Sequence, residues 1–272
     1  ALTMPDTHLK WHYRSRHESL IAFSNREFYD GRLFTFPSPD ALCTKVQLIQ
    51  VDGYYDRGKS RQNLAEGKAI TAEIERRLAT EPQTSIGVVT FSSVQQTLVE
   101  DLLNDLYLRR PDLETVALER EEPLFVKNLE NVQGDERDVI LFSVGYGPDE
   151  AGIVAMNFGP LNREGGWRRL NVAITRAREA MIIFSVLRAD QIDLHRTRAR
   201  GIESLKAFLE FAGKGTQTAR ASLATGQDGL AERIAAQLSQ KGYHADTEVG
   251  FSKFRVDVAV KDPHNTQRYV LG

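Results

Sequence analysis

Four arginines in the middle of the sequence have the chemistry to bind phosphate. They are Arg168, Arg169, Arg176 and Arg178, and they lead into the apolar run MIIF at residues 181–184. A guanidinium keeps its charge and offers a planar fork of donors that suits phosphate oxygens. Apolar residues recur at helical spacing before Arg176, so we expect it where a helix ends and a buried strand begins, at the rim of a sheet. An ordinary solvated basic face is the competing interpretation.

Two further segments carry residues that could act on a ligand. Tyr13 and Arg14 stand together near the start of the sequence and could be a second phosphate-facing arginine with an aromatic beside it, or plain surface residues. Gln133, Glu136 and Arg137 stand in a polar turn between two apolar runs. That combination is unusual in a plain connector, although the turn could be only a loop.

Residues 53–60, GYYDRGKS, match the GxxxxGK[ST] signature of a phosphate-binding P-loop. Three features argue against a nucleotide cradle. Bulky side chains and the negative Asp56 occupy the positions where backbone amides would meet phosphate. The helix pattern starts several residues after Lys59, so no helix dipole is aimed at it, and no later strand ends in the acidic pair that P-loop ATPases use for magnesium. A self-contained NTPase that uses residues 53–60 is therefore only an alternative.

Strands and helices alternate between residues 46 and 186, which predicts an α/β fold: a parallel sheet with helices on both faces. The expected strands are residues 46–51, 86–91, 124–127, 139–144 and 181–184, and the expected helices are 19–28, 63–80, 94–108 and 202–211. Gln95 and Gln96 follow the second strand at its carboxyl end, where open α/β sheets bind ligands. Helix capping would explain them equally well.

The end of the sequence predicts a second, smaller module. Residues 213–228 are small and polar, as in a linker, and the helix and strand pattern restarts after them. A helix is expected at residues 230–238 and strands at 244–249 and 254–260. Asp257 places a carboxylate inside the last apolar run, where an unpaired charge is costly. It is either an edge residue that faces water or a ligand for Mg²⁺.

The composition excludes several classes of protein. A formal net charge of −2 argues against blanket electrostatic binding of nucleic acid, although a local basic groove is compatible with it. The single Cys43 excludes an internal disulfide framework and a cysteine-built metal site. No apolar run reaches the ~20 residues that span a bilayer, and no signal peptide is recognisable. We therefore expect a cytoplasmic protein without a membrane partner.

Three separated segments together resemble the second RecA-like domain of superfamily 1 DNA helicases. Residues 11–17, WHYRSRH, resemble the Q-Y-R-M-H-P segment of that family. Residues 130–138, ENVQGDERD, resemble motif V, and residues 170–178, LNVAITRAR, resemble motif VI, which is the most specific of the three. Their order and separation also match, and the likeness covers roughly residues 8–215.

The resemblance implies a shared ATP site. Arg176 resembles the arginine that reaches the γ-phosphate of ATP across the cleft between two RecA-like domains. Arg14 resembles the other such arginine, with Tyr13 beside the nucleotide. The first RecA-like domain, which holds most of the ATP and the Mg²⁺ in this family, is expected upstream of Ala1. The departure of Trp11-His12 from the family pattern leaves the role of His12 open.

The resemblance also implies roles in the polar turn. Glu136 resembles the motif V glutamate that contacts the ribose of the nucleotide. Gln133-Gly134 resembles the turn that shapes the ribose side of the site. Asn128 and Asn131 lie where motif V residues face the nucleic-acid backbone. The expected partner is DNA, single-stranded or duplex, and RNA is not excluded.

The tail resembles the start of a restriction-endonuclease-like domain, akin to very-short-patch-repair nucleases. The segments that carry this likeness are residues 241–243, 248–250, 254–257 and 262–263. The resemblance implies that Asp257 is the first metal carboxylate of a PD-(D/E)xK site and that Glu232 is its helix glutamate. The remaining ligands are expected after Gly272, so the metal site would be incomplete in this chain.

The sequence therefore predicts three parts: a second RecA-like helicase domain at residues 1–215, a linker at 216–228, and the N-terminal part of a truncated α/β endonuclease-like module at 229–272. The expected function is that of the C-terminal fragment of an ATP-dependent DNA helicase. Such a fragment would hydrolyse no ATP alone. A non-catalytic nucleic-acid-binding module is the alternative from another class.

Overall fold

The computed structural model describes residues 10–38, 43–214, 229–250 and 252–271. The chain divides into two compact units, one of residues 45–215 and one of residues 1–44 together with 216–272. The sequence predicted instead that residues 1–215 form one domain. The linker predicted at 216–228 lies outside the described residues, and the domain assignment itself stays a prediction.

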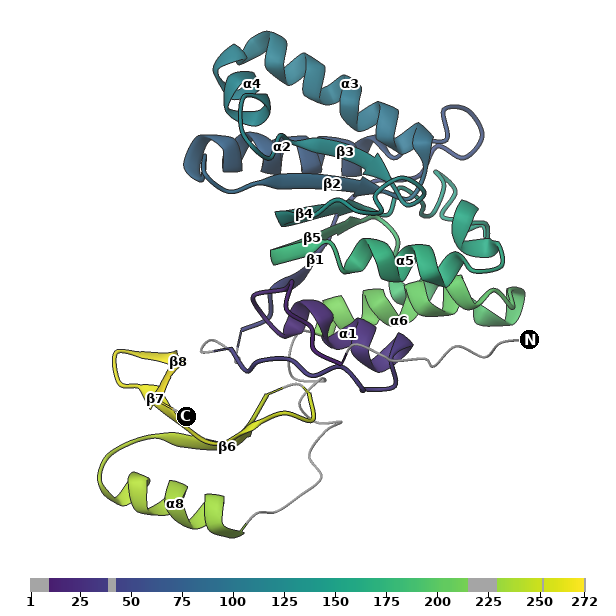
Figure 1. The fold of residues 1–272 in the computed structure, drawn as a ribbon. Coiled ribbons are helices and arrows are strands. Elements are labelled where there is room, and N and C mark those ends of the chain that lie inside the picture. The colour runs from purple at the N-terminus through teal and green to yellow at the C-terminus, as the bar shows by residue number, and fades with distance from the viewer. Residues whose placement is uncertain (1–9, 39–42, 215–228, 251, 272) are drawn as a thin grey trace, which may run out of the picture. The chain divides into compact units, whose positions relative to one another are not determined.

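The larger unit contains a five-stranded sheet in the order β1-β5-β4-β2-β3, and every neighbouring pair is parallel (Figure 1). Its strands are β1 (Val46–Gln50), β2 (Ile86–Thr90), β3 (Phe125–Asn128), β4 (Arg137–Ser143) and β5 (Ala177–Ser185). Each one overlaps a run that the sequence marked as a strand. The predicted α/β class is confirmed.

Helices cover both faces of this sheet. They are α2 (Leu64–Thr80), α3 (Ser93–Arg109), α4 (Pro111–Leu118), α5 (Gly166–Ile174) and α6 (Arg200–Lys214), joined by the short 3-10 turns η1 (Gly159–Asn162), η2 (Ala189–Gln191) and η3 (Leu194–Arg196). Alternate strand residues point to opposite faces. Leu141 therefore joins the core that α2, α3 and α4 form, whereas the ring of Phe142 lies 6.4 Å from that of Phe208 on α6.

Polar side chains set where the helices begin. Asn63 caps α2 by accepting a hydrogen bond from the Glu66 amide over 3.1 Å, and Ser92 caps α3 in the same way from the Gln95 amide over 3.2 Å. Proline fits the first turn of a helix because that turn needs no amide donor. Pro111 begins α4 accordingly, a helix that is not among those expected from the sequence.

The smaller unit combines the two ends of the chain. It contains α1 (Ser19–Phe28), α8 (Gly229–Gln240) and an antiparallel sheet of β6 (Ala245–Val249), β7 (Val256–Asp262) and β8 (Asn265–Leu271). The ring of Trp11 stacks on Phe36 at 4.8 Å and meets Phe254 edge-on at 5.4 Å. This contact packs the N-terminal segment against the tail within one unit.

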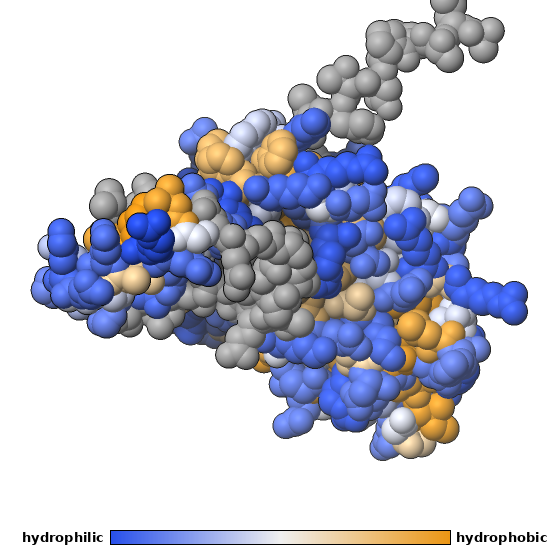
Figure 2. Space-filling model, turned by 90° about the horizontal axis from the view of Figure 1, so that it is seen from below, coloured by the Kyte–Doolittle hydropathy of each residue, from blue (hydrophilic) through white to orange (hydrophobic). Residues whose placement is uncertain are grey.

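Hydrophilic side chains cover most of the molecular face seen in Figure 2, as expected for a chain with 26% charged residues. Within the described ranges, no helix has the length and apolar character that crossing a membrane would require.

Candidate functional site

Arg176 lies between the end of α5 and the start of β5, as the sequence predicted. Its side chain is buried, with 9% of the residue exposed. Its Nε donates to the carbonyl oxygen of Val172 over 2.7 Å, and its Nη2 donates to Oγ1 of Thr175 over 3.0 Å. These two oxygens help to fix the direction of the guanidinium.

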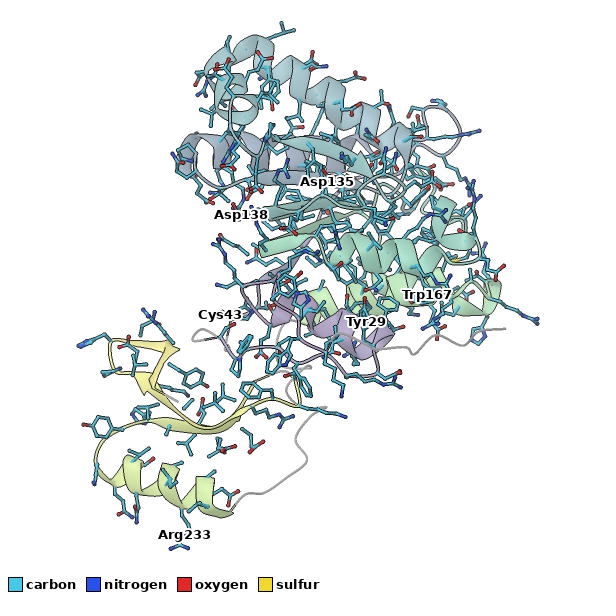
Figure 3. The ribbon with its side chains drawn as sticks, in the orientation of Figure 1. Tyr29, Cys43, Asp135, Asp138, Trp167 and Arg233 are labelled. Carbon is cyan, nitrogen blue, oxygen red and sulfur yellow. The ribbon has the colours of Figure 1, made fainter. Side chains whose placement is uncertain are left out.

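Arg178, two residues further on, is held by carboxylates instead. Its guanidinium donates to Asp138 over 3.0 Å and pairs with both oxygens of Glu122. These hydrogen bonds hold the pKa of Glu122 below its usual range. Asp138, labelled in Figure 3, also accepts from the Ser85 amide over 3.1 Å, so the cluster joins β4, β5 and the residue before β2. Arg178 therefore braces the sheet.

The structure brings the polar turn of residues 133–136 next to Arg176. The Arg137 amide donates to the Arg176 carbonyl over 3.3 Å, and Arg137 pairs with Ala177 in the sheet register. Gln133 and Gly134 are exposed, and Gly134 has a φ of +95°, which favours glycine there. Glu136 is half-buried, with Oε1 3.7 Å from a guanidinium nitrogen of Arg178. Two segments far apart in the sequence thus meet at the amino ends of β4 and β5.

Asn128 and Asn131 lie at the opposite edge of the sheet, where β3 ends. Asn128 is buried, and its Nδ2 donates to Oε1 of Gln96 over 2.9 Å. Its Oδ1 accepts from the Glu130 amide, and its own amide donates to Oδ1 of Asn131 over 3.0 Å. Both side chains therefore shape the start of the loop. Asn131 is exposed and could still meet a ligand.

Gln95 has a structural place at the same carboxyl edge. It is fully buried, and its Nε2 donates to the Asn63 carbonyl over 3.0 Å and to Ser143 over 3.1 Å. Gln96 contacts the Asn128 side chain and the Val126 carbonyl. These glutamines cross-link elements, which favours the structural interpretation over ligand binding.

The sequence reasoning missed Glu66, a fully buried carboxylate beside Gln95. Its oxygens accept hydrogen bonds from the amides of Gly145 and Val186 at 2.7 and 2.9 Å, and from the Ser143 hydroxyl at 2.7 Å. Burial raises the pKa of Glu66 to about 7 in spite of these donors. The N-x-x-E spacing from Asn63 was the available signal, but it indicates only a helix cap.

The P-loop-like segment does not have the geometry of a nucleotide cradle. Oδ2 of Asp56 accepts from both the amide and the hydroxyl of Ser60, at 3.0 and 2.8 Å. The helix that follows begins at Leu64, and Asn63 rather than Lys59 caps it. The carboxylate of Asp56 thus binds the serine that a P-loop would use.

Tyr13 and Arg14 belong to the smaller unit. Tyr13 is 85% exposed and Arg14 is half-buried. Nε2 of His12 lies 2.9 Å from the Ser15 hydroxyl and accepts from the Ser15 amide, so His12 shapes this turn. The predicted contact of Tyr13 and Arg14 with a nucleotide stays a prediction.

Asp257 and Glu232 are exposed, on β7 and α8 respectively. Among the residues that the structure describes, no group of three or more histidine, cysteine, aspartate or glutamate side chains is arranged to hold a metal ion. The metal role assigned to Asp257 and Glu232 therefore stays a prediction.

Known proteins with similar sequences are named as helicases. A family model described as an AAA domain, AAA_12, matches residues 2–187. An "uncharacterized ATP-dependent helicase MG140" of Mycoplasma genitalium is 36% identical over 214 residues, covering 75% of this chain and 18% of that protein. Its homolog in Mycoplasma pneumoniae is 36% identical over 209 residues, with the same coverage. The chain thus spans 18% of the length of these relatives.

Among solved structures, the C-terminal domain of a possible DNA helicase from Lactobacillus plantarum aligns with a TM-score of 0.35 and 12% identity, covering 64% of this chain and 87% of that domain. The family assignment rests on the sequence match to residues 2–187, which is more than half of the chain. The chain belongs to the AAA domain family AAA_12.

Proposed function

We propose that this chain contains the second RecA-like domain of a superfamily 1 DNA helicase, which supplies Arg176 to the γ-phosphate of ATP. The observation that carries the proposal is the hydrogen bond from the Arg137 amide, directly after the turn of residues 133–136, to the Arg176 carbonyl at the amino ends of β4 and β5. Relatives named as ATP-dependent helicases support it. Most of the ATP and the Mg²⁺ would be bound by another domain of the same protein.

The hydrogen-bond donors of Arg176, at the amino ends of β4 and β5, suit the phosphate of a nucleotide. Phosphoryl transfer requires positive charge at the oxygens of the transferred phosphate, and an arginine from outside the nucleotide-binding domain can supply it. Val172 and Thr175 already orient the Arg176 guanidinium, so little reorganisation is needed when the phosphate arrives. The turn at Gln133 and Gly134 is exposed, so the ribose would contact it there, with Glu136 at the end of the turn.

An arginine that acts across a domain boundary couples hydrolysis to closure of the two domains. This coupling is what a translocase needs to convert ATP into movement along DNA. Tyr13 and Arg14 would approach the same nucleotide, and Asn131 would face the nucleic-acid backbone, with Asn128 holding its loop. Asp257 and Glu232 would belong to a nuclease-like tail in a cytoplasmic enzyme.

The test uses the longer helicase of which this chain would be part. Arg176→Ala should lower the DNA-stimulated kcat for ATP by a factor on the order of 10³ or more, with DNA affinity retained. Arg176→Lys should not restore turnover, because lysine lacks the planar fork. The matched control is Arg188→Ala, which removes an exposed arginine whose ion pair is with the exposed Asp190. Unchanged turnover in Arg176→Ala would reject the proposal.

The alternative from another class, a non-catalytic nucleic-acid-binding module, predicts the opposite pattern. Arg176→Ala would then weaken DNA binding. It would also reduce the salt dependence of binding, because DNA that makes one phosphate contact fewer releases fewer counterions when it binds.

A further inference from the structure

Two arginines stack on one tryptophan at the beginning of α5. Cζ of Arg200 lies 4.1 Å from the centroid of the Trp167 ring, and Cζ of Arg168 lies 5.1 Å from it. Trp167 is half-buried, whereas both arginines are exposed. A guanidinium over an aromatic face is attracted by the ring quadrupole, and its planar fork of N–H donors suits phosphate oxygens.

Glycines make this arrangement possible. A Cβ at Gly201 would lie 2.3 Å from the carbonyl oxygen of Leu161 and 3.1 Å from the Trp167 amide. A Cβ at Gly166 would lie 2.6 Å from the carbonyl oxygen of Pro160. Glycine at 201 lets the first turn of α6 pack closely against Leu161 and the first turn of α5, and glycine at 166 lets α5 begin close to η1. Arg200 is thereby fixed over Trp167 by the backbone packing.

The charge at this place is unbalanced. Arg168, Arg198 and Arg200 are exposed, and none of them forms an ion pair within the described part of the chain. Between Arg163 and Arg169 the only acidic residue is Glu164, and residues 194–202 contain none. A chain with a net charge of −2 therefore concentrates positive charge at one end of α5 and α6.

This cluster adjoins the loop that carries Asn131. Oε1 of Glu130 lies 3.7 Å from a guanidinium nitrogen of Arg163 and 3.9 Å from one of Arg169. It is separate from Arg176, which lies beyond the opposite end of the nine-residue helix α5, about 13 Å along its axis. Figure 3 shows Trp167 beside α5 and α6, on the other side of the sheet unit from Asp138.

We propose that Trp167, Arg163, Arg168, Arg198 and Arg200, here called the Trp167 surface, bind the sugar–phosphate backbone of single-stranded DNA. Positive side chains that track the backbone are typical of single-strand binding without sequence preference. Here the Trp167 ring holds two of them, Arg168 and Arg200, beside it. Asn131 would continue the same track along the carboxyl edge of the sheet. The proposal rests on the helicase function proposed above and adds to it the path of the strand.

The test measures binding of a fluorescein-labelled single-stranded oligonucleotide by anisotropy at several salt concentrations. The double variant Arg168→Ala/Arg200→Ala should weaken binding tenfold or more. It should also reduce the slope of log K against log salt by about 1.4, as expected for two lost contacts to a single strand. Both arginines are exposed, and the melting temperature of the variant would show that it is folded. The matched control, Arg109→Ala/Arg188→Ala, removes two exposed arginines elsewhere and should leave affinity and slope unchanged.

A second readout uses Trp167 itself. The chain has two tryptophans, so in Trp11→Phe the remaining tryptophan fluorescence comes from Trp167. Titration with unlabelled single-stranded DNA should change this signal at the same concentration as the anisotropy. Unchanged affinity and slope in the double variant, or a silent Trp167, would overturn the proposal. So would binding of an acidic polypeptide that competes fully with the DNA at lower concentration. The helicase proposal is judged separately, by turnover in Arg176→Ala.

Discussion

The main-chain amide of Arg137 donates to the carbonyl oxygen of Arg176 over 3.3 Å. This hydrogen bond belongs to the ladder between β4 and β5, in which Arg137 is level with Ala177. The ladder therefore fixes the spacing between the turn that ends at Glu136 and the guanidinium that follows α5. The relative position of Glu136 and Arg176, which we propose contact the nucleotide, therefore depends on the sheet. Residues that stabilise the sheet should affect this position indirectly.

Arg178→Ala should lower the free energy of unfolding by about 1–3 kcal/mol, because it leaves Asp138 and Glu122 without their charged donor. Urea denaturation of the 272-residue chain would measure the change. Arg188→Ala breaks an ion pair whose side chains are 55% and 72% exposed, so its effect should stay within about 0.5 kcal/mol. Equal effects of the two substitutions would contradict the bracing role of Arg178.

Glu66 should make the stability of the chain depend on pH. Its pKa is raised from 4.5 to about 7 in the folded state by burial, so the folded state binds the extra proton between these values. The contribution of Glu66 to the free energy of unfolding should therefore be greatest below about pH 4.5 and should decrease as pH rises to about 7, by up to about 3 kcal/mol.

Denaturation of the native chain and of Glu66→Gln at a series of pH values would isolate this contribution. Glutamine has no charge to bury, so the difference in stability between the two proteins should shift in favour of Glu66→Gln as pH rises. A shift in the other direction would mean that the amides of Gly145 and Val186 stabilise the carboxylate more than burial opposes it.

The sequence was sufficient for the sheet because its central strands β2, β4 and β5 are apolar runs that are largely buried. It was sufficient for the place of Arg176 because a helical repeat ends just before it. It was insufficient for Glu66, whose donors come from two strand ends far away in the chain. The same holds for Arg200 and Trp167, which no local pattern connects. Spacing along the chain reveals caps and strands, whereas cross-links between elements require the packed structure.

The isolated chain should hydrolyse no ATP, and Lys59→Ala should change neither its stability nor its binding of ATP. The physical reason is that Asp56 holds Ser60 and that α2 begins only at Leu64, so no ring of amides surrounds a phosphate at Lys59. A coupled phosphate-release assay with and without single-stranded DNA would check this. Turnover that disappears in Lys59→Ala would instead establish the self-contained NTPase.

Gly201→Ala should destabilise the chain on the order of 1–3 kcal/mol, because the added methyl group would meet backbone atoms of Leu161 that cannot move independently. Gly58→Ala is the matched control: nothing lies within 4 Å of its Cβ, so we expect a change within about 0.5 kcal/mol. Thermal unfolding would compare the two. Because Gly201 also places Arg200 over Trp167, Gly201→Ala should weaken single-stranded DNA binding while the protein is still folded. Full affinity in a destabilised Gly201→Ala would separate the packing of α6 from the Trp167 surface and would count against that surface as the path of the strand.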